Sequence, residues 1–335
     1  MSNFKTLADI SKIIKEMPVK DIEAEAKAIA HQNQLTKPPG ALGILEELAV
    51  FLSSWQRTTK PSLKTVQALV FAGNHGICAQ GVNPFPQGVT KQMVENFKAG
   101  GAAINQLCEV SGADLNIVPL SLDDPTADFT EEEAMSELDL CEAIEIGARS
   151  VNLNSDLILL GEMGIGNSTI SSALAASVFG GRVERWVGAG TGSDQKGQAH
   201  KAAIIELGIK KHGLRNNLSA LLAFGGREQA AICGAILAAR EASIPVLLDG
   251  FICTAAAAPL FGTSKNSLDH CLFGHLSAEP GHRLLLEAMG KSAILDLNMR
   301  LGEGTGAALA LSILKGAIAC HNNMATFDSA GISSS

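Results

Sequence analysis

Several features that mark common protein classes are missing from this chain of 335 residues. It has no block of Lys or Arg, and its formal net charge is -8. Because phosphate backbones are held mainly by Lys and Arg, nucleic acid is not expected as a partner. Residues 1–17 lack the uninterrupted apolar core of a signal peptide, because charged side chains interrupt them at Lys5, Asp9, Lys12, Lys15 and Glu16. Export is therefore not predicted.

Apolar runs long enough to span a bilayer are also missing. The two most apolar stretches are Ile244–Phe261, which Asp249 interrupts, and Ala307–Ala319, which Lys315 interrupts. A transmembrane helix needs about 20 predominantly apolar residues, and neither stretch provides them. We expect a soluble protein that does not associate with a membrane.

No Cys-x-x-Cys pair occurs among the seven cysteines of the chain, which are Cys78, Cys108, Cys141, Cys233, Cys253, Cys271 and Cys320. An odd number of scattered cysteines is typical of free thiols in a reducing cytoplasm and argues against disulfides or a zinc site. We therefore predict a cytoplasmic protein without a bound metal.

Three catalytic signatures are absent as well. The chain has no complete G-x-x-x-x-G-K-S/T loop, no G-x-S-x-G nucleophile elbow and no H-E-x-x-H helix. Covalent acyl transfer of the elbow type and zinc hydrolysis are therefore excluded. The run Gly188-Ala189-Gly190-Thr191-Gly192 is a poor dinucleotide fingerprint, because the spacing to its third glycine is wrong.

The pattern that is present predicts an α/β fold. Short apolar runs end in Gly, Asn, Asp or Glu and lead into helical stretches, at Ala68–Ala72, Leu157–Leu160, Ala220–Phe224 and Val246–Leu248, with weaker candidates at Leu115–Leu122 and Cys271–His275. Nearly continuous apolar strands that alternate with helices indicate a parallel sheet buried on both faces. We predict a Rossmann-like, open, mostly parallel sheet of about six strands, with ligands at the carboxyl ends of the strands.

Helical periodicity dominates both ends of the chain. Residues 3–33 predict two amphipathic helices, the second with Ile22, Ala26 and Ile29 on its apolar face, and a third helix is expected over Ile44–Gln56. The helical period returns after His282, including over Ile294–Arg300. We predict a small helical domain formed by residues 1–60 together with 291–335, and a large α/β domain over 61–290. The Pro- and Gly-rich segment 35–43 is a linker or a ligand-facing loop.

The segment Gly161–Asn167 is a candidate anion site. It precedes Ser168, Thr169 and an apolar helix, so free backbone N–H groups and the positive end of a helix dipole would face a ligand. An ordinary β-to-α turn explains one such loop equally well. Several glycine loops at strand ends, with Lys201 beyond Gly190-Thr191, favour a phosphorylated ligand.

Glu303 is the first candidate for acid–base chemistry, because Gly302, Gly304 and Gly306 surround it at the start of a long apolar helix. A helix connection in which Glu303 offsets the helix dipole accounts for the same pattern equally well. Glu162, in the glycine loop, is the second candidate. A general-base role for His75 is conceivable, but a loop histidine bonded to backbone is the simpler interpretation.

Taken together, eight segments resemble the nicotinate-nucleotide:5,6-dimethylbenzimidazole phosphoribosyltransferases, which act in the lower-ligand branch of cobalamin synthesis. They follow one another over nearly the whole chain, at Leu35–Gly43, Pro86-Gln87 with Met93–Phe97, Gly100–Ile104, Gly161–Thr169, Gly190–Gly192, Asp249–Ile252, Glu279–His282 and Arg300–Gly306. No single motif is decisive, but the ordered set is far more specific than one glycine loop.

The resemblance implies a reaction and a site. The family transfers the 5-phosphoribosyl group of nicotinate mononucleotide to a benzimidazole nitrogen, with inversion from β to α, and releases nicotinate. Glu303 would be the general base and Glu162 a second carboxylate. The implied substrate-binding residues are Gly164, Ile165, Gly166, Asn167, Gly190, Thr191, Lys201, Asp249, Ser277, His75, Phe85, Gln87, Met299, Arg300 and Leu301.

Within that set, Lys201, Ser277 and the Gly164–Gly166 backbone would bind phosphate. The acceptor base would lie between residues 74–87 and Met299-Arg300-Leu301. The family fold is a Rossmann-like sheet with a small helical domain, in a homodimer whose neighbouring subunit completes the site. No cofactor is implied.

Three positions depart from the family pattern, at Asn74, Ile44 and Arg227, and the absence of tyrosine leaves Phe85 as the aromatic side chain for stacking in its loop. These departures leave the choice of acceptor base open without touching Glu303. Transfer to other lower-ligand bases, such as purines or phenols, is one alternative. A non-catalytic nucleotide-binding subunit is another, since glycine loops also bind phosphates without chemistry.

Overall fold

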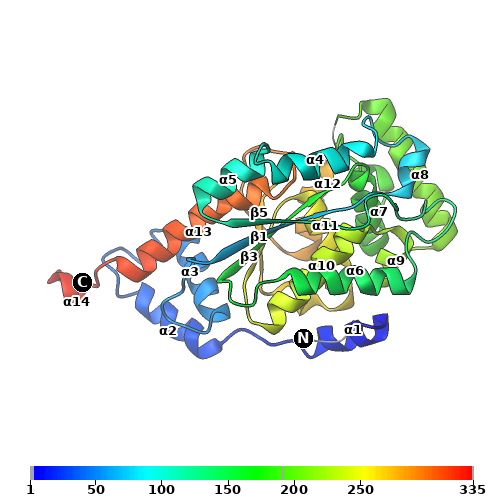
Figure 1. Ribbon diagram of the computed structural model, residues 1–335. Coiled ribbons are helices and arrows are strands. Elements are labelled where there is room, and N and C mark those ends of the chain that lie inside the picture. Colours follow the sequence, from blue (N-terminus) through cyan, green and yellow to red (C-terminus); the bar gives the residue numbers. More distant parts are fainter. Residues whose placement is uncertain (1–3, 191, 334–335) are drawn as a thin grey trace.

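The computed structural model describes residues 4–190 and 192–333 (Figure 1). Its centre is a six-stranded sheet with the order β2-β1-β3-β4-β5-β6, in which every neighbouring pair is parallel. The strands are β1 (Val66–Ala72), β2 (Asp114–Pro119), β3 (Leu157–Met163), β4 (Val246–Leu248), β5 (Cys271–His275) and β6 (Ala293–Leu295). The prediction of an open parallel sheet of about six strands is confirmed.

Helices cover both faces of the sheet (Figure 1). One face carries α6 (Glu137–Ser150), α7 (Asn167–Phe179), α10 (Arg227–Glu241), α11 (Phe251–Thr263) and α12 (Pro280–Met289). The other face carries α3 (Ile44–Trp55), α5 (Ala103–Ser111) and α13 (Thr305–Asn323), with α4 (Gly88–Lys98) beside them. Because both faces are covered, every residue of β1 is buried, which explains why Gln67 is the only polar residue in this strand.

Small residues allow α6 and α10 to pack closely. A Cβ on Gly147 would lie 1.9 Å from the carbonyl oxygen of Ala231, and a Cβ on Gly234 would lie 1.9 Å from that of Ile144. Only glycine fits at these two positions. The tight helix pair fixes the start of α10, which lies near the carboxyl ends of β1 and β3.

Two predicted elements are wrong. Ala220–Phe224, predicted as a strand, belongs to the helix α9 (Ser219–Phe224), and the sixth strand is instead β6, in a segment predicted to be helical from Ile294. Periodicity cannot distinguish a short buried helix from a short buried strand, and hydrogen bonding of β6 to β5 decides the conformation of residues 293–295. Residues beyond β6 run without helix to Gly302.

The remaining elements are α1 (Leu7–Lys15), α2 (Ile22–Gln32), α8 (Gln195–His212), α14 (Phe327–Ala330) and the 3₁₀ turns η1 (Gly76–Gln80), η2 (Val183–Arg185) and η3 (Lys265–Leu268). The apolar face predicted for α2 is wrong, because Ile22 and Ile29 are 63% and 47% exposed, whereas Ala24 and Ala28 are buried. Small alanines let α2 lie close against α3, and the larger side chains turn outward.

Segments from both chain ends lie together. The helices α2, α3 and α13 pack against one another, and Leu35 forms an antiparallel bridge with Thr326. The first helix is elsewhere, because α1 buries Ile10 and Ile14 in the core beneath α11 (Figure 1). Among the described residues, no helix is both long and apolar enough to cross a membrane.

Candidate functional site

The carboxyl ends of β3, β4 and β5 surround a narrow cavity of about 80 Å³. It lies beside the place where the strand order reverses around β1, which is where open α/β sheets bind ligands. Its lining contains many predicted site residues: Glu162, Gly164, Ile165, Gly166, Asn167, Gly190, Lys201, Asp249, Ser277, Arg300 and Leu301. Asn83, Met163, Ser168, Gly250, Phe251, Ile252, His275, Glu279 and Gly302 complete it.

Glu162 stands at the end of β3 and is only 5% exposed. The side-chain amide of Asn167 donates a hydrogen bond to Glu162 Oε2, closing the glycine turn between them. Burial raises the pKa of Glu162 well above its ordinary value, and the neighbouring Asp249 raises it further. The hydrogen bond from Asn167 favours the ionised form and opposes these two effects.

Glu303 occupies a left-handed turn directly before α13. Its φ is 65°, between Gly302 at 87° and Gly304 at 92°, a conformation that side chains other than glycine rarely adopt. The turn lies directly on β3, because a Cβ on Gly161 would be 2.6 Å from the carbonyl carbon of Glu303. A non-glycine residue held in this region is a form of strain that clusters at functional sites.

The Glu303 carboxylate is buried, with 6% of the residue exposed, and its Oε2 has no hydrogen-bond partner among the described residues. Burial raises the pKa of Glu303, and a backbone hydrogen bond from Ile104 at the start of α5 opposes the shift. The side chain does not line the narrow cavity. Its turn does, because Gly302 lies against Glu162. The two predicted carboxylates are therefore neighbours on opposite sides of one glycine.

The amino end of α7 forms one side of the cavity. Gly166 is the N-cap of this helix, and Lys201 Nζ on α8 donates to Ser168 Oγ at 3.2 Å. Burial lowers the pKa of Lys201, whereas the charge of Glu279 raises it. The positive end of a helix dipole beside a buried lysine is a suitable environment for a phosphate.

Both backbone polar groups of Gly190 are hydrogen-bonded to side chains of the site. Its N–H donates to Glu279 Oε1 at 2.8 Å, and its carbonyl oxygen accepts from Arg300 Nη1 at 2.7 Å. Arg300 belongs to the segment that also carries Glu303. The loop of Gly190 and the Glu303 segment are thus joined across the cavity.

Ser277 follows β5 beside two buried histidines. The backbone N–H of Ser277 donates to His282 Nδ1 at 2.8 Å, so His282 Nε2 carries the proton and donates to Thr254 Oγ1 at 3.0 Å. Burial lowers the pKa of His282 to about 3, which keeps it neutral. His275 Nε2 lies 3.7 Å from Asp249 Oδ1. No group of three His, Cys, Asp or Glu side chains in the described ranges is arranged to hold a metal ion.

Several predicted site residues lie outside the cavity lining. His75 is fully buried behind it, and the side chain of Gln87 donates to the carbonyl oxygen of His75. Phe85 is 47% exposed on the adjoining loop, and the carbonyl oxygen of Met299 accepts a hydrogen bond from the backbone N–H of Ala278, the residue after Ser277. Thr191 lies outside the described residues.

The positions that depart from the family pattern make local contacts away from the lining. Asn74 Nδ2 donates to the carbonyl oxygen of Leu122 at 2.8 Å, Arg227 pairs with Asp124 at 3.3 Å, and Ile44 is 44% exposed at the start of α3. These contacts leave Glu162 and Glu303 undisturbed.

Several polar residues of this region were not among the predicted site residues. Ser168 and Glu279 line the cavity, and Glu228 is fully buried behind it. Ser168 and Glu279 lie in the family-like segments Gly161–Thr169 and Glu279–His282, and each is a polar residue close to the start of a helix. That position could have identified them as candidate site residues. Glu228 follows Gly225-Gly226 at the start of α10. It was overlooked because the segment before it was predicted to be a strand.

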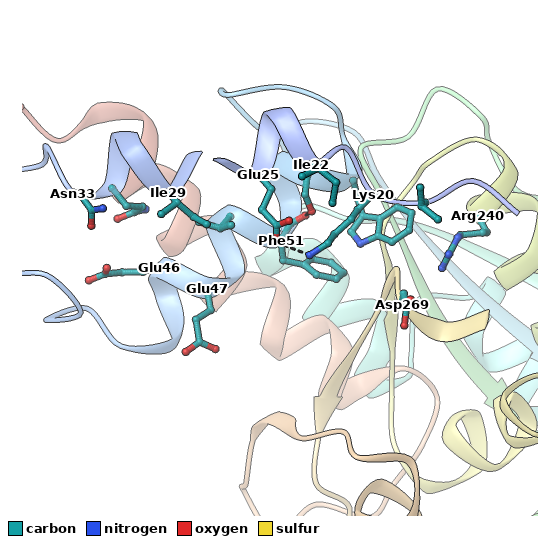
Figure 2. Close-up of a pocket in the computed structure, with 15 residues that line it drawn as sticks. Lys20, Ile22, Glu25, Ile29, Asn33, Glu46, Glu47, Phe51, Arg240 and Asp269 are labelled. Carbon is teal, nitrogen blue, oxygen red and sulfur yellow. Dashed lines mark hydrogen bonds and ion pairs between the residues drawn. The ribbon is translucent and has the colours of Figure 1, made fainter. Parts of the chain in front are cut away.

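A larger hollow of about 940 Å³ lies elsewhere, between α2, α3 and the loops at the amino edge of the sheet. Figure 2 shows Ile22 and Ile29 of α2 opposite Phe51 of α3, with Arg240 and Asp269 at the far end. We do not place the active site there, because strand carboxyl ends, the start of α7, the Glu162 carboxylate and the turn that carries Glu303 all lie at the narrow cavity.

Several known proteins are similar to this chain in sequence and in structure. The family model for phosphoribosyltransferases matches residues 17–332. Nicotinate-nucleotide–dimethylbenzimidazole phosphoribosyltransferases of Rhodobacter capsulatus and Mesorhizobium japonicum are 54% and 50% identical to the chain; the alignments cover 99% and 98% of the chain and 99% of each relative. The crystal structure of CobT from Thermus thermophilus matches with a TM-score of 0.87 and 39% identity, over 93% of this chain and 100% of that one. The chain belongs to the phosphoribosyltransferase family.

Proposed function

We propose that this enzyme transfers the 5-phosphoribosyl group of nicotinate mononucleotide to 5,6-dimethylbenzimidazole, giving α-ribazole 5′-phosphate and nicotinate. The observation that carries the proposal is the placement of Glu162 and the Glu303 turn beside the amino end of α7 and Lys201. A phosphate bound there brings the anomeric carbon of a ribosyl group toward the carboxylates. The relatives named above supply the identity of the two substrates.

The chemistry needs one base. A benzimidazole ring nitrogen attacks the anomeric carbon with its lone pair, the bond to nicotinate breaks, and the bonding pair neutralises the pyridinium. The proton on the other benzimidazole nitrogen passes to Glu303, which avoids a cationic product in a dry pocket. Ionised Glu162 stabilises the positive charge that develops on the ribose ring.

Substrate binding requires movement of the flanking loops. The cavity of about 80 Å³ is well below the several hundred Å³ usual for small-molecule sites. The contacts of Gly190 with Glu279 and Arg300 join the two segments that must separate. We assign the acceptor base to the space between residues 74–87 and Met299-Arg300-Leu301, where Phe85 is exposed for stacking.

We also propose a homodimer. The segment Leu35–Gly43 carries part of the family resemblance, yet it contributes no residue to the lining of the cavity. In a dimer it can approach the site of the neighbouring subunit.

Free thiols at all seven cysteines support a reducing, cytoplasmic location.

The experiment that tests the reaction is direct. Purified protein is incubated with nicotinate mononucleotide and a panel of benzimidazoles, purines and phenols, and the products are identified by mass spectrometry. We expect α-ribazole 5′-phosphate and nicotinate in equal amounts with dimethylbenzimidazole. Release of nicotinate without a ribosylated base, or no turnover with any acceptor, would contradict the proposal.

A further inference from the structure

The fully buried pair of His75 and Glu228 lies behind the glycine turn of the site. His75 follows β1, and Glu228 is the second residue of α10. Both side chains are 0% exposed, and His75 Nε2 lies 3.2 Å from Glu228 Oε1. Neither ring nitrogen of His75 and neither carboxylate oxygen of Glu228 has a hydrogen-bond partner among the described residues. The two side chains therefore face each other in the interior, away from water.

Glycines from three separate loops lie against this pair: Gly73 after β1, Gly164 after β3, and Gly226 between α9 and α10. A Cβ on Gly73 would lie 2.3 Å from Glu228 Oε2, and one on Gly226 would lie 2.5 Å from the same oxygen. A Cβ on Gly164 would lie 2.9 Å from His75 Nε2. Only hydrogen atoms fit between these backbones and the pair. The turn that carries the helix N–H groups of α7 therefore rests on the imidazole.

The pair also places charge close to Glu162. The titratable groups that face Glu228 from packed elements are His75 after β1, Cys78 in η1 and Glu162 on β3. The charge of Glu228 adds to burial and to Asp249 in raising the pKa of Glu162. A buried charge is costly unless it is paired, and His75 is the partner that the structure provides.

We propose that His75 and Glu228 form a positioning pair, which seats the Gly164–Gly166 turn and holds a negative charge behind Glu162. Neither side chain lines the cavity, so the pair acts on the substrate only through the turn and through Glu162. This inference rests on the proposed function. It adds Glu228 to the machinery and gives His75 a role different from direct contact with substrate.

The first test separates charge from shape by comparing Glu228→Gln with Glu228→Ala. The glutamine keeps the shape of the glutamate and so the support of the turn, and the KM for nicotinate mononucleotide should therefore stay within about twofold. In Glu228→Gln the acidic limb of the pH profile of kcat/KM should move to lower pH. Glu162 must be ionised for catalysis, and its pKa falls when the repelling charge of Glu228 is removed. Glu228→Ala also removes the support of the turn, and kcat/KM should fall by up to about 10²-fold, with a raised KM.

The second test replaces the whole pair with apolar side chains of similar size, as His75→Leu with Glu228→Met. Replacing a buried ion pair in this way often preserves stability, whereas removing one partner does not. The double variant should therefore melt no lower than Glu228→Ala and still show the acidic limb shifted to lower pH. A double variant with the wild-type pH profile and activity would show that the pair only fills space.

Arg240→Met is the matched control. Arg240 is 2% exposed near the other end of α10 and stacks 4.4 Å from the centre of the Trp55 ring, so its loss removes a buried charge from the same helix. We expect a lower melting temperature and an unchanged pH profile. No turnover by the wild type would contradict the proposed function, whereas wild-type turnover with an unshifted profile in Glu228→Gln would contradict the positioning pair.

Discussion

Asp249 Oδ2 accepts the backbone N–H of Gly304 at 3.1 Å, and Asp249 Oδ1 accepts that of Ala307 at 3.0 Å. Asp249 follows β4, whereas Gly304 and Ala307 belong to the amino end of α13. The sheet edge therefore caps the helix, and the helix start fixes the left-handed turn that carries Glu303. The negative carboxylate also complements the positive end of the helix dipole. Asp249 was predicted to bind substrate, and both its oxygens are engaged with backbone.

Asp249→Asn should weaken this connection, because an amide offers one acceptor oxygen where two N–H groups are present. Loss of a hydrogen bond to a charged acceptor costs about 1.5 to 3 kcal/mol of unfolding free energy. Displacement of Glu303 should also lower kcat. Chemical denaturation and steady-state kinetics measure the two effects.

Asp156→Asn is the control, because Asp156 Oδ2 accepts the N–H groups of Lys64 and Thr65 at 2.7 and 2.9 Å before β1, at the opposite edge of the sheet. It should lose stability and keep kcat. Equal kcat in the wild type and Asp249→Asn would show that the Glu303 turn holds its position without Asp249.

Lys201→Ala should raise the KM for nicotinate mononucleotide, because Lys201 lies beside Ser168 at the amino end of α7, where we propose that the phosphate binds. A charge-assisted contact contributes about 1 to 3 kcal/mol, which corresponds to roughly five- to 150-fold in KM. Lys210→Ala, an exposed lysine of the same helix, should leave KM unchanged. An unaltered KM in Lys201→Ala would place the phosphate elsewhere.

Glu303→Gln should lower kcat by roughly 10² to 10⁴ while mononucleotide binding persists, because the amide keeps the shape and cannot accept the benzimidazole proton. Burial raises the pKa of Glu303, so wild-type kcat should decline on the acid side at a pH above the usual carboxyl range. If Glu303 only complements the dipole of α13, the variant loses about 0.3 to 1 kcal/mol of stability and keeps its turnover. Full activity would make Glu162 the next candidate base.

Glu162→Gln should stabilise the protein at neutral pH. Burial raises the folded-state pKa of Glu162 above its unfolded value, so the folded wild type binds the proton more tightly. The contribution of Glu162 to the stability of the wild type is therefore fully present below the pKa that this group has in the unfolded chain. It is lost as the pH rises through the higher pKa that the group has in the folded protein. Glutamine does not titrate and avoids that loss.

The melting temperatures of the wild type and Glu162→Gln should therefore diverge as pH rises and converge below about pH 4. Glu206→Gln, an exposed glutamate of α8, serves as the comparison and should show no such divergence. A wild type that melts higher than Glu162→Gln at pH 8 would indicate that the ionised carboxylate is fully compensated in the fold.

The proposed homodimer predicts that activity depends on protein concentration. If the neighbouring subunit completes the site, specific activity should fall on dilution in parallel with dissociation measured by analytical ultracentrifugation. Full specific activity in a sedimenting monomer at micromolar concentration would contradict the dimer.

The sequence by itself determined the architecture and the principal candidates. Apolar runs such as Ala68–Ala72 and Leu157–Leu160, which alternate with helical stretches, are typical of strands buried on both faces, so the sequence pattern predicted a parallel sheet. Glycines around Glu303 and Glu162 indicated close backbone approach, and the structure has such approaches at Gly161 and Gly302. The ordered motifs identified the family.

Only the tertiary structure decided features that depend on contacts between distant segments. The run Ala220–Phe224 became a helix and residues 293–295 became a strand, because short apolar segments take the conformation that their neighbours permit. Ile22 and Ile29 turned outward, because the close approach of α2 and α3 favours alanine at their contact.

The roles of His75 and Asp249 were also decided by tertiary contacts. A sequence shows that both residues follow strands, but it does not show which way a side chain points from a strand end. Asp249 turns toward the start of α13, and His75 turns toward Glu228, a residue 153 positions further along the chain. Burial away from water requires each polar group to find a partner, and the fold brings that partner from a distant part of the sequence.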